Sequence, residues 1–147
     1  MKRLRLQAGS NLIEFALVLP LLLVLMFGIV DFSLALFDKA VITNAAREGA
    51  RAGMVFGNSR MTDADIRTVV TRYCSTYLIS FGSGLQSPVT IERRDAITNA
   101  IVLVADVKSG DILRVTVPYR YDYLVMSKLI PSLGTLNLRG TSVMRFE

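Results

Sequence analysis

Hydrophobic side chains form one long block near the start of the chain. Residues 12–30 contain a single charged side chain, that of Glu14, and otherwise only apolar residues, glycine and proline. A helix crosses the roughly 30 Å hydrocarbon core of a bilayer with about 20 residues, at about 1.5 Å per residue. The block therefore predicts one membrane-spanning helix over about residues 12–30.

The pattern becomes amphipathic after this block. Polar side chains recur every four residues along one helical face, at Lys39, Thr43, Arg47 and Arg51. This spacing has the period of an α-helix. One continuous helix is therefore expected from about Asn11 to Val55, half of it in lipid and half outside, with Gly57-Asn58 as its stop.

Small residues line another face of the same predicted helix. Ala45, Gly49 and Gly53 are four apart, as are Ala46 and Ala50. Small side chains at this spacing let a second helix approach closely, and glycine inside a helix costs about 0.5–1 kcal/mol relative to alanine. This face therefore predicts close packing, either on a helix of another subunit or on the chain's own C-terminal domain, or on each in a different stretch.

The rest of the chain predicts a small α+β domain. Thr62 followed by Asp63 and Asp65 is typical of a helix start, and this helix is expected to end near Ser80. Strand-like runs cover residues 89–93, 101–107, 112–123 and 136–146, with a helical turn around 126–133. We expect one helix packed on an antiparallel sheet of three or four strands. Pro118 in the third run indicates an edge position or a bulge.

The positive charge is concentrated at the N-terminus. The net charge is +5, of which Lys2, Arg3 and Arg5 contribute +3, leaving 5 − 3 = +2 for the rest of the chain. This distribution does not predict a nucleic-acid groove. Basic residues that precede a membrane span hold that end in the cytoplasm, so the C-terminal domain is expected on the outer side.

The amino-acid composition does not favour an enzyme. The chain has no histidine, which removes the commonest general base and the commonest metal ligand. Cys74 is the only cysteine and lies within the apolar stripe of the second helix, where a buried structural thiol is expected. We therefore expect no catalytic residues, no metal and no cofactor.

Glu14 is an unusual residue, because a carboxylate at the centre of a bilayer costs about 2.5–3.5 kcal/mol. A cut after Gly9 would place a new α-amine on Ser10, with a pKa of about 7.7–8.0. Glu14, the fifth residue of the shortened chain, could then neutralise that amine in its own chain or in a neighbour and so favour one register between subunits. The alternative is a solvated Glu14 in the headgroup layer.

A secretory signal peptide is a competing interpretation of the same segment. A basic start followed by an apolar run is also typical of such signals, and Ser33-Leu34-Ala35 offers small residues for a cut. Glu14 inside the run, the length of the run and the helical pattern that continues past residue 35 all speak against it. If it holds, the C-terminal part is a soluble exported domain.

Gly9 and the pair Glu14-Phe15, set between a basic leader and a membrane run, resemble the cleavage motif of type IV prepilins. The stretches 14–20, 27–32 and 43–52 resemble the TadE-like minor pilins, or pseudopilins, of tight-adherence (Flp) pilus systems. This resemblance covers about the first 55 residues, and the C-terminal part fits the family only loosely.

The resemblance implies a leader (1–9), an N-terminal helix (10–57) and an exterior head (58–147). It implies cleavage between Gly9 and Ser10 by a prepilin peptidase, and a non-enzymatic subunit that primes or caps a pilus. The implied partners are the membrane, the peptidase, sister major and minor pilins and the pilus assembly platform. The implied location is the bacterial inner membrane, with the head periplasmic. The alternative is a membrane-tethered, extracytoplasmic binding module.

Overall fold

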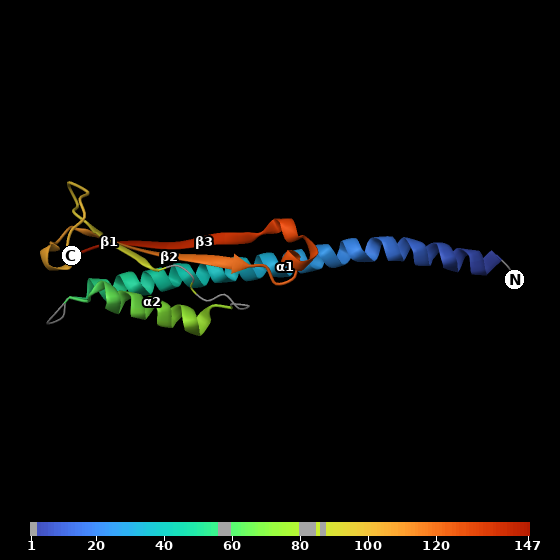
Figure 1. Ribbon diagram of the computed structural model, residues 1–147, viewed down its shortest axis with the longest axis horizontal. Coiled ribbons are helices and arrows are strands. Elements are labelled where there is room, and N and C mark those ends of the chain that lie inside the picture. The colour runs from blue at the N-terminus through green and yellow to red at the C-terminus, as the bar shows by residue number, and fades with distance from the viewer. Residues whose placement is uncertain (1–2, 56–59, 80–84, 86–87) are drawn as a thin grey trace.

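A single helix dominates the molecule. The computed structural model describes residues 3–55, 60–79, 85 and 88–147, with side chains from residue 12 onward. Helix α1 (Arg3–Met54) forms a long rod whose N-terminal half projects away from the remaining elements (Figure 1). It begins eight residues before the predicted start and ends one residue before the predicted end; the predicted stop at Gly57-Asn58 lies outside the described residues.

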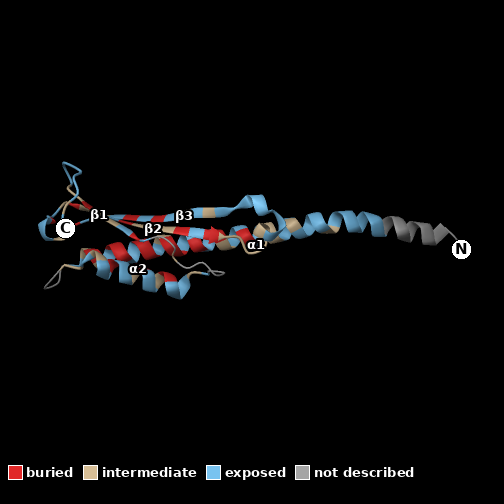
Figure 2. Ribbon diagram, viewed as in Figure 1, coloured by how far each residue is buried: buried red, intermediate tan, exposed pale blue. Residues whose placement is uncertain are grey.

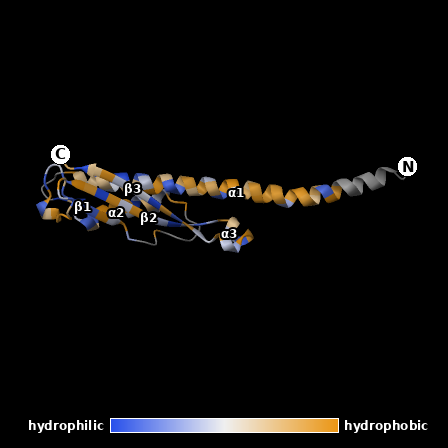
Figure 3. Ribbon diagram, turned by 90° about the horizontal axis from the view of Figure 1, so that it is seen from above, coloured by the Kyte–Doolittle hydropathy of each residue, from blue (hydrophilic) through white to orange (hydrophobic). Residues whose placement is uncertain are grey.

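The projecting half of α1 is apolar and uncovered. Residues 12–30 are mostly exposed (Figure 2) and mostly hydrophobic (Figure 3). Among the described residues, α1 is the one helix long and apolar enough to cross a membrane. Because exposed leucine and phenylalanine side chains on such a rod are stable in lipid and costly in water, α1 indicates a membrane-anchored, single-pass protein.

Helix α2 (Asp63–Tyr77) starts where the sequence predicts. The Thr62 side chain accepts a hydrogen bond from the backbone N–H of Asp65, and the Asp65 carboxylate accepts one from the backbone N–H of Thr62. This reciprocal capping box satisfies N–H groups that a helix start otherwise leaves free, and the bonds from Thr62 lower the pKa of Asp65. The helix ends at Tyr77, before the predicted end at Ser80, which lies outside the described residues.

Three strands form an antiparallel sheet in the order β1-β2-β3: β1 (Thr90–Arg94), β2 (Ile112–Asp122) and β3 (Thr135–Arg145). The fold class is α+β, as predicted. The helical turn also forms, as α3 (Met126–Leu129) and the 3₁₀ turn η2 (Pro131–Leu133) between β2 and β3. Odd-numbered side chains of β2 from Leu113 to Tyr121 are buried and alternate with more exposed ones, as a strand with one buried face requires.

The strand predicted over 101–107 is wrong. Ile101 makes one bridge to Arg94, and the chain then turns into a 3₁₀ segment, η1 (Val104–Asp106). The physical reason is topological: Ile101 approaches β1 on the edge opposite β2, so the chain must leave that edge and cross over before it can form β2. The apolar side chains of Ile101 and Leu103 are consequently exposed instead of packed in a core.

Pro118 lies in the central strand, where its missing N–H would normally be costly. Pairing between β2 and β3 runs through Pro118 and Arg139 without interruption, so the predicted bulge is not needed. Pairing with β1 ends at Thr116, which makes β2 locally an edge at Pro118. The predicted edge position therefore holds in this part of the sheet.

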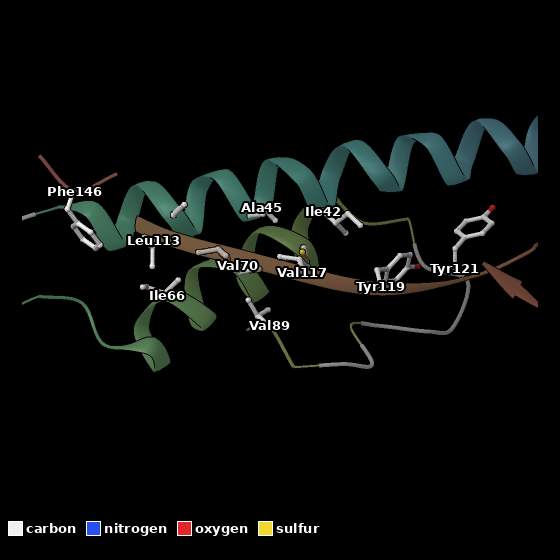
Figure 4. Close-up of a cluster of buried hydrophobic side chains, with 14 of the residues drawn as sticks. Ile42, Ala45, Ile66, Val70, Val89, Leu113, Val117, Tyr119, Tyr121 and Phe146 are labelled. Atoms are coloured by element: carbon white, nitrogen blue, oxygen red, sulfur yellow. The ribbon is translucent and has the colours of Figure 1, made fainter. Parts of the chain in front are cut away.

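The core of the head lies where α1, α2 and the sheet meet (Figure 4). The C-terminal half of α1 packs against α2 and against β2 and β3, so it belongs to the head as much as to the anchor. Cys74 is buried in this core as expected, and burial raises the pKa of its thiol to about 11. The buried guanidinium of Arg93 pairs with the Asp63 carboxylate and so ties β1 to the start of α2.

Candidate membrane-assembly site

The predicted processing segment lies on the free part of α1. Gly9 and Ser10 are helical, and the structure describes only the backbone at these two positions. Glu14 and Phe15 are exposed on the same helix. Among the residues whose side chains are described, Glu14 makes no hydrogen bond or ion pair. Any partner for its carboxylate must therefore come from the first residues of the chain or from outside the subunit.

The small-residue face lies at the other end of α1 and is covered by the subunit itself. Ala45, Ala46 and Ala50 are fully buried. A Cβ atom at Gly53 would lie 2.7 Å from Ile66 Cδ1 and 2.7 Å from Leu113 Cδ2, and one at Gly49 would collide with Val70. Of the two partners left open above, the chain's own α2 and β2 occupy this face. A helix of another subunit must use a different surface.

A second close approach, not noticed in the sequence, joins β3 to α1 at Gly140. A Cβ atom there would lie 2.6 Å from the carbonyl carbon of Ile42 and 2.8 Å from the backbone nitrogen of Thr43. One turn earlier, the Lys39 ammonium donates to the Arg139 carbonyl oxygen. Glycine inside a strand often marks close contact with another backbone, so the isolated Gly140 of the last strand was the available signal.

Asp31 joins the membrane-spanning part of α1 to the head. Its buried carboxylate accepts hydrogen bonds from three consecutive backbone N–H groups, those of Leu124 (3.0 Å), Val125 (3.2 Å) and Met126 (2.9 Å). The Tyr121 hydroxyl donates to the Asp31 carbonyl oxygen at 3.2 Å. The first residue after the apolar block therefore holds the β2–β3 connection against α1.

Asp38, two turns further along α1, is a second buried carboxylate facing the head. Its Oδ1 accepts a hydrogen bond from the backbone N–H of Ile79 at 3.1 Å, just beyond the end of α2. Sequence reasoning assigned no role to Asp31 or Asp38. The available signal was their spacing, because residues 31, 35, 38 and 42 fall on one helical face. The two apolar residues of this face predict that it is buried, and the two carboxylates can be buried there only if they are hydrogen-bonded.

Comparison with known proteins decides how far the family resemblance extends. Residues 9–51 match the model of the TadE-like protein family. The resemblance predicted from the sequence is thus confirmed over most of α1. No curated protein and no solved structure matches the chain.

The TadE-like segment begins at Gly9 and includes Glu14, Asp31 and Asp38. It ends at Arg51, so it contains the membrane span and most of the helix face that the head covers. The TadE-like family is a structural family associated with tight-adherence pili, so the match over residues 9–51 indicates a pilus-associated protein. The matched segment thus ends inside α1, and α2 and the sheet lie outside it.

Proposed function

We propose that this protein is a minor pilin, or pseudopilin, that primes or caps a tight-adherence type IV pilus after a prepilin peptidase removes residues 1–9. The observation that carries the proposal is the TadE-like match starting at Gly9, on a helix whose exposed apolar half leads into a folded head. Residues 10–57 are the assembly helix and 58–147 the head. The partners are the peptidase, sister pilins and the assembly platform.

The basic leader supports the proposed orientation. Lys2, Arg3 and Arg5 precede the span, and basic residues favour the cytoplasmic side. The head then lies on the periplasmic side of the bacterial inner membrane. In this orientation the bond between Gly9 and Ser10 lies at the cytoplasmic end of the span, where a membrane peptidase can reach it.

The burial pattern of α1 narrows the surface available for assembly. The small residues Ala45, Ala46, Gly49, Ala50 and Gly53 face the subunit's own head, whereas the side chains of residues 12–30 are mostly exposed. Lipid covers this exposed segment in the membrane, and helices of sister pilins would replace the lipid in a filament. The proposed contacts with other pilins therefore involve the first half of α1.

Helix geometry supports the pairing of the Ser10 amine with Glu14. Residues four apart lie on the same helical face, and side chains tilt toward the N-terminus, so Glu14 reaches back toward the first turn of the shortened helix. The same carboxylate can reach the amine of a neighbouring subunit at a similar depth. In either case each charge compensates the other in an apolar environment, where either one alone would be costly.

Cleavage is tested by the intact mass of the full chain, expressed with an active prepilin peptidase or with a catalytically inactive variant. The expected result is loss of residues 1–9 with the active enzyme alone. An intact chain in both samples would contradict the proposal. Loss of residues 1–35 in both would support the secretory-signal alternative.

Glu14→Ala is expected to leave cleavage intact but to weaken co-assembly with sister pilins. Because an unpaired intramembrane charge costs a few kcal/mol, recovery of the complex after mild detergent extraction should fall at least about tenfold. Glu48→Ala is the matched control, since Glu48 is an exposed carboxylate of the same helix within the head. If the two variants recover the same amount of complex, pairing of Glu14 with the Ser10 amine does not contribute to co-assembly.

One observation favours the alternative of a membrane-tethered binding module. The turn after β1 exposes apolar side chains at the end of the sheet far from the span, where Ile97 is 93% exposed. Such a surface is typical of a partner contact. A chain that is not cleaved at Gly9 and does not co-purify with pilins would favour this second function.

A further inference from the structure

The connection between β2 and β3 exposes an unusual number of large apolar side chains. Residues 126–133, here called the apolar turn, comprise α3 and η2. Leu129 is 50% exposed, Ile130 37% and Leu133 42%. Three such side chains on one short turn form an apolar surface that water solvates poorly.

The apolar turn is held at the end of the membrane span. The three N–H groups that bind the Asp31 carboxylate belong to residues 124–126, at its start. At about 1.5 Å per residue, residues 12–30 span about 29 Å, close to the thickness of the hydrocarbon core. Asp31 therefore lies near one boundary of the hydrocarbon, and its hydrogen bonds to residues 124–126 hold the turn beside it. Helix α3 contacts α1 and is labelled in Figure 3.

Most backbone N–H groups of the turn are already hydrogen-bonded within the protein, as an apolar environment requires. The N–H groups of Lys128, Leu129, Ile130 and Leu133 all donate to backbone carbonyl oxygens within the turn or just before it. Pro131 has no N–H to satisfy. Lipid tolerates backbone only where its polar groups are bonded internally, and this turn largely meets that requirement.

We propose that the apolar turn is a second membrane contact, which inserts Leu129, Ile130 and Leu133 into the boundary between headgroups and acyl chains on the head side of the bilayer. We assign this contact to lipid and not to a second copy of the chain, because the turn adjoins a helical span whose apolar side chains are exposed and suited to lipid. Lys128 is exposed on the same turn and can reach lipid phosphates with its ammonium.

This contact would set how the head sits on the membrane. A single helix leaves a head free to rotate and tilt, whereas a second contact beside Asp31 restricts both. The inference requires membrane insertion of α1 only, so it stands or fails independently of pilus assembly and of cleavage.

Tryptophan fluorescence tests the contact, because the chain contains no tryptophan. The full chain with Leu133→Trp is reconstituted into vesicles of phosphatidylethanolamine and phosphatidylglycerol, with and without bromine on the acyl chains. Leu22→Trp, an exposed position in the span, is the reference for lipid contact. Ile97→Trp is the reference for solvent, since it lies at the other end of β2, roughly 35 Å away by strand length.

The emission maximum of Leu133→Trp is expected at a shorter wavelength than that of Ile97→Trp. Brominated lipid is expected to quench the emission of Leu133→Trp nearly as strongly as that of Leu22→Trp. Leu129→Trp, on α3, should behave in the same way and guards against a local defect at residue 133. Quenching no stronger than that of Ile97→Trp would overturn the proposal. A blue shift without bromine quenching would also overturn it, because it would mean that protein covers the turn.

Discussion

Gly140→Val is expected to prevent β3 from packing on α1 and thereby to unfold much of the head. The added side chain would begin 2.6 Å from the carbonyl carbon of Ile42, a backbone atom that cannot move without bending α1. β3 pairs with β2 along its whole length, so displacing it also disturbs the sheet. The expected loss is at least about 3 kcal/mol, a large part of the stability of a small domain.

Urea unfolding in detergent micelles, followed by near-ultraviolet circular dichroism, measures this loss. Gly28→Val is the matched control, because a Cβ atom at Gly28 has nothing within 4 Å. The control should unfold close to the wild-type midpoint. If both variants unfold at the same midpoint as the wild type, the close approach of β3 and α1 is not a determinant of stability.

Asp31→Ala is expected to release the apolar turn from α1. The substitution leaves the N–H groups of Leu124, Val125 and Met126 without their acceptor. Because a partly buried N–H without a partner costs about 1–3 kcal/mol and some of these groups will find water, the expected loss is about 2–4 kcal/mol. Asp31→Asn keeps one acceptor oxygen and should lose less.

Hydrogen exchange of these three amides, together with the unfolding midpoint, distinguishes this effect from a general loss of charge. The control is Asp122→Ala, which removes a partly exposed carboxylate at the end of β2, just before this connection and 3.8 Å from Arg120. A surface pair of this kind contributes at most about 1 kcal/mol. If the two alanine variants exchange and unfold alike, Asp31 has no special role in holding the connection.

Local signals predicted most elements of this fold. The capping pattern of Thr62 and Asp65 located the start of α2, because a helix start depends on residues that are neighbours in sequence. The alternation of apolar and polar residues along 112–123 predicted β2, because one face of this strand is buried along its whole length and the other is not. The run at 101–107 is also rich in β-branched residues, but it does not form a strand, because a strand also needs a free partner edge from which the chain can continue to the next element.

Some functional surfaces were likewise predictable from local sequence, and others were not. Gly9, Glu14 and the apolar block could be recognised in the sequence because their meaning depends on spacing along one helix and on the bilayer as solvent. The small residues from Ala45 to Gly53 predicted close packing, but not with what. Only the tertiary structure supplied the partner, because helix α2 and strand β2 reach that face from distant parts of the chain.

The sequence by itself determined that this protein has one apolar helix suited to a membrane, an α+β head and a TadE-like N-terminal segment. The tertiary structure alone decided that Asp31 binds residues 124–126 and that Gly140 meets Ile42. The physical reason is that each of these contacts joins residues about 90 or more positions apart. Their energies depend on where the sheet lies against α1, and no local pattern of side chains records that position.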